Sequence, residues 1–259
     1  MDTTSTRSLR DVLAFPFRDP NWKGRFAIGA GLCLAGFLIP FLPVLFVYGY
    51  LLHVMREVIR DESLTLPAWD AWGKFFLDGL KAFGVALVYM MPSIVVFGVG
   101  MWSYFVGMIG AAGMSDPYAS SGTNAQALWL MFGSMGVFFL GMLLGSLFWI
   151  LGVVPLPMAA GNLASTDRLG SAFRLRELSK ILAANPFGFF LAWVIVLGLT
   201  AMLYLAMMLP YMTVVLICAI PVLASLFGFY LLLVGAALFG LAYRQARIRL
   251  AEAEAAAQG

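Results

Sequence analysis

The chain has 259 residues, of which 62% are hydrophobic and 11% charged, and its mean hydropathy is +0.93. A soluble domain usually carries about 25% charged residues, because it needs a polar surface. The composition therefore excludes a soluble globular enzyme, a disordered chain and a disulfide-stapled secreted domain. The net charge of +3 is too small to indicate nucleic-acid binding.

Charged residues are segregated along the chain. Lys and Arg fall within 7–25, 56–81, 168–180 and 244–249, whereas 26–55 and 181–243 contain no Asp, Glu, Lys or Arg. This pattern predicts an all-α, polytopic bundle of about six membrane helices. We expect a polar N-terminal segment at 1–25, a single transmembrane domain at 26–243 and a C-terminal tail at 244–259.

The later apolar stretches are each long enough to cross a bilayer. Residues 82–113 and 126–163 flank the polar loop Met114–Gln126, which has no Lys or Arg. Residues 186–209 and 212–243 meet near Pro210. Because basic clusters favour the inner side, the sequence predicts a multi-pass protein of the cell membrane with both termini in the cytoplasm.

The first apolar stretch, 26–55, has basic residues on both sides, so both of its ends should face the cytoplasm. Its length is too small for two full spans. We therefore predict a hairpin of two short helices bent at Pro40 and Pro43. The alternative is one kinked span with the N-terminus outside.

Leu66–Lys81 reads LPAWDAWGKFFLDGLK. Helical spacing places aromatic residues and Gly79 on one face, and Asp70, Lys74, Asp78 and Lys81 on the other. It predicts an amphipathic helix on the cytoplasmic surface, either sensing lipid or a partner or, as we favour, connecting to the next span. Asp167–Leu182 is a second, less regular surface segment, in which Leu175, Leu178 and Leu182 share a face.

Small residues recur in the apolar stretches. Gly141 and Gly145 form a GxxxG motif, which allows close helix approach. We favour packing within the bundle over oligomerisation. Cys33 and Cys218 lie in apolar runs without metal-site or disulfide spacing, so we expect both to be buried.

Groups for chemistry are sparse. The last four predicted spans hold no ionisable residue away from their ends, and we expect no buried charge. No recognised catalytic, phosphate-binding or metal motif occurs, so we expect no enzymatic activity and no cofactor. Asn162 is the candidate for an intramembrane polar site, and Pro92 and Pro155/Pro157 could break helices around such a site.

Several strings occur together: FPFRDPNW at 15–22, GY at 49–50, LPAWD at 66–70, LDGLK at 77–81 and YMMP at 89–92, with looser matches at 172–173, 185–186 and 240–243. Together they resemble the bacterial and archaeal membrane-protein family called domain of unknown function 4013. The resemblance covers most of the chain and implies a multi-pass fold without an assigned catalytic residue. The interfacial or family-motif candidates are Trp22, Pro67, Trp69, Asp70, Trp72, Asp78, Gly79, Tyr89 and Pro92.

The function best matched by these features is a structural or accessory membrane protein that organises lipid or a membrane partner complex. Its expected partners are the lipid bilayer, other membrane proteins or a second copy of the chain. The alternative is a transporter or channel for a neutral or lipid-like substrate, built around the proline-broken stretches.

Overall fold

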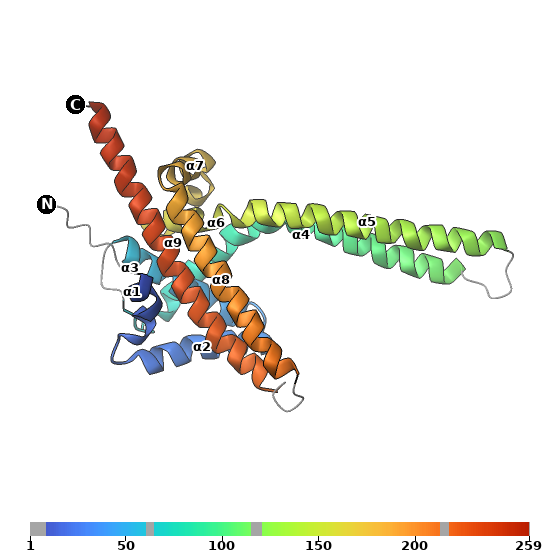
Figure 1. Ribbon diagram of the computed structural model, residues 1–259, viewed down its shortest axis with the longest axis horizontal. Coiled ribbons are helices and arrows are strands. Elements are labelled where there is room, and N and C mark those ends of the chain that lie inside the picture. Colours follow the sequence, from blue (N-terminus) through green and yellow to red (C-terminus); the bar gives the residue numbers. More distant parts are fainter. Residues whose placement is uncertain (1–8, 61–64, 115–120, 213–217, 259) are drawn as a thin grey trace. The chain divides into compact units, whose positions relative to one another are not determined.

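The computed structural model describes residues 9–60, 65–114, 121–212 and 218–258, and every regular element in these ranges is a helix. Figure 1 shows them in chain order: α1 Leu9–Ala14, η1 Phe15–Phe17, α2 Trp22–Leu38, α3 Leu42–Ile59, α4 Trp72–Met114, α5 Ser121–Val153, α6 Leu156–Thr166, η2 Leu169–Phe173, α7 Leu175–Ala184, α8 Pro186–Tyr211 and α9 Ile220–Gln258. The helical fold expected from the composition is confirmed.

Five helices in these described ranges are long and apolar enough to cross a membrane. α2 has 17 residues, which span about 26 Å and fall short of a hydrocarbon core of about 30 Å. Five such helices stand against the six or so expected, because α2 is too short to count among them. α3, with 18 residues, is also short, so the expectation that the first two helices are short is confirmed.

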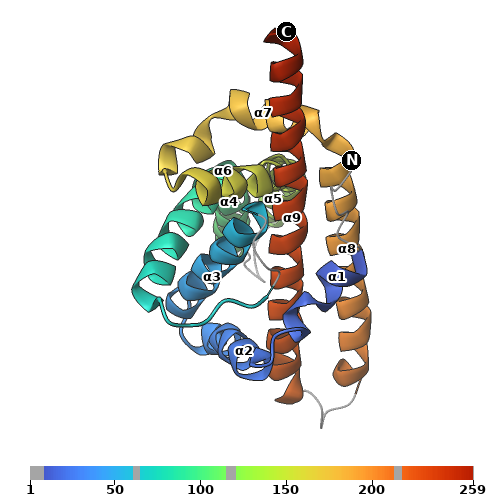
Figure 2. The ribbon, with the colours of Figure 1, turned by 90° about the vertical axis from the view of Figure 1, so that its left-hand side faces the viewer.

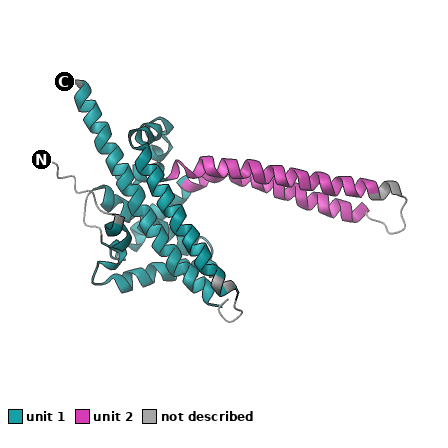
Figure 3. Cartoon of the chain, in the orientation of Figure 1, with its two compact units in different colours: residues 1–85, 157–259 teal, residues 86–156 magenta. Residues whose placement is uncertain are grey.

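The chain divides into two compact units, coloured separately in Figure 3. Unit 1 comprises residues 1–85 and 157–259, and unit 2 comprises residues 86–156. In unit 1, α9 packs against α2, α3, α7 and α8, and Figure 2 shows it passing along the middle of that group. The core of unit 1 lies between α3 and α9, where Tyr50, Phe229 and Leu233 are fully buried.

Unit 2 consists of the second part of α4 packed against α5. The two helices approach through small residues: a Cβ on Gly141 would lie 3.0 Å from the Gly100 Cα, and a Cβ on Gly107 would collide with Ser134. Gly145 faces the Phe97 ring. Gly141 and Gly145 thus pack α5 against α4, as expected.

The predicted break near Pro40 and Pro43 is confirmed. α2 ends at Leu38 and α3 begins at Leu42. Between them the Leu42 amide donates to the Pro40 carbonyl (3.0 Å), which closes a γ-turn at Phe41. Phe41 has a φ of 74°, a conformation that strains any residue with a side chain.

The expected separate surface helix at Leu66–Lys81 is wrong. Residues 66–71 are not helical, and 72–81 form the first turns of α4. Tertiary contacts explain the difference, because Leu66 is fully buried and the Pro67 carbonyl accepts a hydrogen bond from the Tyr50 hydroxyl (2.9 Å). These contacts hold the segment in an irregular conformation despite its helical periodicity.

The stretch 126–163, expected as one span, is two helices, and they are separated at Pro155, one of the prolines considered able to break a helix. α5 ends at Val153 and α6 begins at Leu156, because Pro155 cannot continue the helical hydrogen bonds. Pro92, by contrast, lies inside α4 without ending it, so the possible break there is not found. A membrane helix can lose one hydrogen bond at a proline and continue.

The second surface segment, expected at Asp167–Leu182, is formed by η2 and α7. Its buried side chains include Leu178 and Ile181, whereas Leu175 is exposed, so the apolar face differs from the expected one. α9 runs without a break through residues 244–258. Cys33 is half-buried and Cys218 is exposed, so the expected burial of Cys218 is wrong; it lies at the connection before α9, outside the helix packing.

Candidate functional site

Residues from the LPAWD string are held by α3. The Trp69 ring stacks on Tyr50, with centroids 4.1 Å apart and planes only 4° from parallel. The Trp69 indole donates to the Arg25 carbonyl (2.9 Å), while Tyr50 donates to Pro67. Stacking and hydrogen bonding together fix the irregular segment 66–71 against α2 and α3.

Gly79 lets α4 cross α3 at backbone contact. A Cβ on Gly79 would lie 1.8 Å from the Leu45 carbonyl oxygen, and a Cβ on Gly49 would lie equally close to the Phe75 carbonyl oxygen. No side chain fits at either position. The crossing places Asp78, the neighbour of Gly79, inside unit 1.

Asp78 forms a buried ion pair with Arg56 of α3. The Arg56 Nη1 lies 3.1 Å from the Asp78 Oδ2, and both side chains are almost fully buried. The Arg56 Nε also donates to the Ala164 carbonyl of α6 (3.0 Å). The expectation that no charge is buried is therefore wrong, because each charge is compensated by a partner at hydrogen-bonding distance.

Asp167 and Lys81 extend this pair toward the surface. The Lys81 ammonium lies 2.8 Å from the Asp167 Oδ1 and 3.6 Å from the Asp78 Oδ1. The Arg56 Nη2 lies 3.8 Å from the Asp167 Oδ1. The hydrogen bond from Lys81 holds the pKa of the Asp167 carboxyl below its ordinary value.

Asn162, the predicted intramembrane polar site, lies fully buried on the same helix α6. Its Oδ1 accepts from the Tyr243 hydroxyl of α9 (2.6 Å), and its Nδ2 donates to the Ser171 carbonyl of η2 (3.2 Å). Tyr243 lies also 3.2 Å from the Ser165 hydroxyl. The Asn162 side chain therefore joins α6, η2 and α9.

We call these residues the polar junction: Arg56, Asp78, Lys81, Asn162, Asp167 and Tyr243. They belong to α3, α4, α6 and α9, and to the residue that follows α6. α6 joins the two halves of the junction, since its Ala164 carbonyl binds Arg56 and its Asn162 binds Tyr243.

The other predicted site residues are not members of the polar junction. Trp22 begins α2 and packs edge-on against Phe17 (5.0 Å between centroids). Asp70 is exposed, and Trp72 is partly exposed beside Trp69. Tyr89 and Pro92 belong to unit 2. The motif residues thus form no single site.

Sequence reasoning missed Arg56 and Tyr243. The signal for Arg56 was its spacing, because Leu45, Gly49, Leu52 and Arg56 recur along one stripe of α3 and all four are buried. Asp78 was assigned to the polar face through its spacing from Lys74, although it follows the buried Phe75 by three residues. Tyr243 gave no such signal, because it lies at the end of a uniformly apolar run.

The chemistry of the polar junction is that of a structural network. Two cations face two carboxylates, and the amide and phenol are hydrogen-bonded to each other. In the residues that the structure describes, no three His, Cys, Asp or Glu side chains gather in a way that could hold a metal ion.

A family model described as "Protein of unknown function (DUF4013)" matches residues 32–212 of the chain. The match includes the strings at 49–50, 66–81 and 89–92 that carried the resemblance, whereas those at 15–22 and 240–243 lie outside it. No curated protein and no solved structure matches the chain.

Proposed function

The chain belongs to the DUF4013 family, and from the surfaces of its two units we propose that it is a structural or accessory membrane protein that organises lipid or a membrane partner complex. The proposal assigns no enzymatic activity to the chain. The bilayer itself is the first partner, and partner membrane proteins or further copies of the chain are the others.

The observation that carries the proposal is the exposed apolar surface of unit 2. The side chains of Trp102, Trp129 and Leu143 are 72%, 79% and 69% exposed. In the most apolar 18-residue stretch of α4 only 17% of residues are buried, whereas 61% of the residues of α3 are buried. Exposing this much apolar surface to water is unfavourable, whereas covering it with lipid or partner helices is favourable.

The lengths of the helices in unit 2 also support a membrane location for that unit. α5 has 33 residues, which extend about 50 Å and exceed a hydrocarbon core of about 30 Å. Residues 86–156 contain a single charged residue, Asp116, which falls outside the described residues. α5 and the part of α4 in unit 2 can therefore each cross a bilayer without burying a charge in it.

The proposed topology is multi-pass in the cell membrane, with both termini in the cytoplasm. Its support is that Lys and Arg are confined to four clusters. Two long apolar stretches separate the second cluster from the third, and two more separate the third from the fourth, so all three can face the same side of the membrane. A reporter fused after Lys180 and another fused after Gly259 should report the same compartment. Opposite compartments would contradict this topology.

The accessory role is tested by isolating the full chain from native membranes with a mild detergent and identifying what remains bound. We expect phospholipid or membrane proteins at a fixed ratio to the chain. A matched variant, Leu143→Gln with Trp129→Gln, should lose a partner that covers unit 2, because both side chains are exposed and their replacement leaves the α4–α5 contact unchanged.

A transporter for a neutral or lipid-like substrate is the second candidate. Its support is the helix break at Val154–Pro155, which precedes α6 and the buried Asn162. A hydrophilic solute recovered at a fixed ratio to the chain, and lost in Asn162→Leu, would favour this candidate and overturn the accessory role.

A further inference from the structure

A cationic groove lies along η2 and α7 in unit 1. Two open pockets, of about 620 Å³ and about 470 Å³, adjoin there and share Arg174. Their cationic lining is Arg168, Arg174, Arg176 and Lys180, and we use the name cationic groove for these four residues. Among the described residues that line the two pockets, Glu177 is the one carboxylate.

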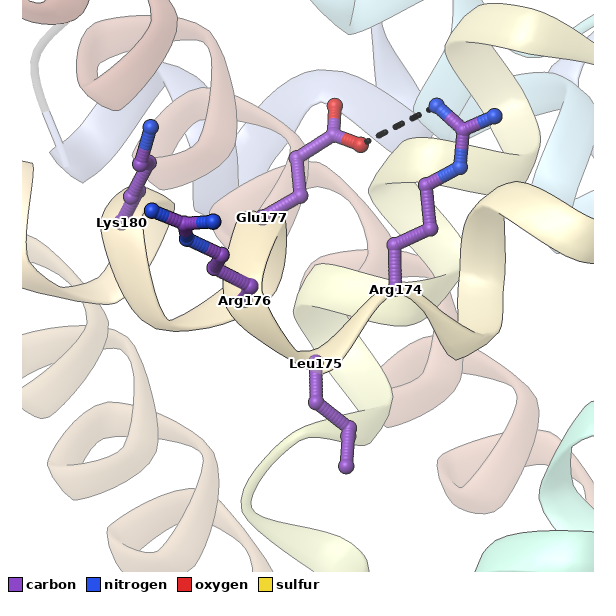
Figure 4. A pocket seen from close by; sticks show the side chains of 5 residues that line it. All are labelled: Arg174, Leu175, Arg176, Glu177 and Lys180. Atoms are coloured by element: carbon purple, nitrogen blue, oxygen red, sulfur yellow. Dashed lines mark ion pairs between the residues drawn. The ribbon is translucent and has the colours of Figure 1, made fainter.

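Much of the positive charge of the groove is not neutralised by the protein. Glu177 is shared between Arg174 and Arg247, each at 3.7 Å. Figure 4 shows Arg176 and Lys180 extending together, away from the Glu177–Arg174 pair. Within the described part of the chain, neither Arg176 nor Lys180 has a carboxylate within ion-pair distance.

The groove lies at the level where the apolar part of α9 ends. The uncharged run of α9 ends at Tyr243, and the next turns contact α7: Arg247 pairs with Glu177, and Arg249 donates to the Ala184 carbonyl (3.2 Å). Figure 2 shows α7 crossing α9 near this point. If α9 spans a bilayer, its apolar end marks the depth of the lipid headgroups.

Exposed apolar side chains accompany the cations. Leu175 is 65% exposed and points away from the cationic side chains in Figure 4, and Leu169 and Phe173 of η2 are also exposed. A segment with cations on one side and unburied apolar groups on the other fits a membrane interface, where tails meet the apolar side and headgroups the cations. A free phosphate ion would use only the cations.

We infer that the cationic groove binds the phosphate headgroup of an acidic phospholipid. The anionic phosphate lies against Arg176 and Lys180, and Leu175 reaches the acyl chains. Arginine and lysine attract anionic lipid at a membrane surface, and a pocket between several of them adds a defined position for the phosphate. The inference rests on the proposed membrane location and names the lipid class that unit 1 organises.

The test uses the full chain in an uncharged detergent. Its thermal unfolding midpoint is measured against added dioleoylphosphatidylglycerol, dioleoylphosphatidylcholine or inorganic phosphate. We expect phosphatidylglycerol to raise the midpoint at concentrations where the other two have little effect. The variant Arg176→Gln with Lys180→Gln should weaken the apparent affinity for phosphatidylglycerol about tenfold or more.

The matched control is Lys23→Gln with Arg60→Gln, which removes the same charge from two exposed positions that do not line the groove. An equal loss of affinity in this control would overturn the inference, since general attraction would then explain the binding. Equal stabilisation by inorganic phosphate, or by phosphatidylcholine, would overturn it as well. Both variants must unfold at the parent midpoint without lipid; if the groove variant does not, the same titration with Lys180→Gln alone decides.

Failure of this inference is distinguishable from failure of the proposed function. Resistance of the chain to alkaline carbonate extraction from membranes tests the membrane location alone. A chain that stays in the membrane but shows no preference for phosphatidylglycerol refutes only the acidic-lipid site. A chain that carbonate releases refutes the membrane location and the accessory role with it.

Discussion

The helices inside unit 1 and the helices inside unit 2 are held together by different means, although both units are helical and largely apolar. Unit 1 buries an ion pair, an amide and a phenol at the polar junction, where four helices meet. Unit 2 joins two helices through small residues, with the Gly141 and Gly100 backbones in contact. Polar networks fix a unique arrangement of many helices, whereas a two-helix hairpin needs only close backbone approach.

The strongest test of this difference is loss of the buried ion pair. Asp78→Ala leaves the Arg56 charge buried without its carboxylate, so unit 1 should lose about 3–5 kcal/mol of stability. Chemical denaturation of the purified chain in mild detergent measures this loss. The double variant Asp78→Ala with Arg56→Met should recover most of it. A single variant as stable as the parent would show that the pair does not hold unit 1.

The next largest effect is expected at the α3–α4 crossing. Gly79→Ala places a Cβ 1.8 Å from the Leu45 carbonyl oxygen, which forces the two backbones apart at a cost of about 2–3 kcal/mol. Gly84→Ala is the matched control, since a Cβ there has nothing within 4 Å and alanine favours helix. Equal unfolding midpoints for the two variants would rule out the tight crossing.

A smaller loss is expected from Tyr243→Phe. The change removes the donor to the buried Asn162 Oδ1 and should cost about 1–2 kcal/mol. Tyr48→Phe serves as control, because Tyr48 is partly exposed and its hydroxyl has no hydrogen bond among the described residues. Equal unfolding midpoints for the two phenylalanine variants would show that Asn162 does not link α6 to α9 through Tyr243.

The smallest effect is a pH dependence from Asp167. Its folded-state pKa lies below the unfolded value, so its stabilising contribution is complete above the unfolded pKa of about 3.9 and is lost as pH falls through the lower folded pKa. In Asp167→Asn this part of the acid destabilisation should disappear, as denaturation at a series of pH values would reveal. If the unfolding free energy of Asp167→Asn fell at acid pH as steeply as that of the parent, this would contradict the Lys81–Asp167 interaction.

The sequence predicts the structure well at the apolar runs and at the paired prolines 40 and 43, although Pro92 does not end its helix. Uninterrupted apolar runs predicted the long helices, and Pro40 with Pro43 predicted the break between α2 and α3. Both features follow from local chemistry, because a proline lacks an amide donor and an apolar run of twenty residues suits a membrane span.

Long-range contacts account for what the sequence did not predict. The segment 66–71 has helical periodicity, but Tyr50 and Arg25 bind it in an irregular form. Asp78 has a polar spacing along α4, yet Arg56, 22 positions earlier in the chain, makes its burial favourable. A single sequence does not reveal which distant residue supplies such a partner.

The most direct test of the account is the environment of the unit 2 surface in a lipid vesicle. A spin label is attached to Leu143→Cys, and in a second protein to Arg176→Cys, after both native cysteines are replaced by alanine. Relaxation of each label by oxygen and by a water-soluble nickel chelate is then measured. Oxygen should reach the label at 143 far better than nickel does, and nickel should reach the label at 176 better than oxygen does. Strong relaxation by nickel at 143 would show that this apolar surface faces water, and would contradict the account.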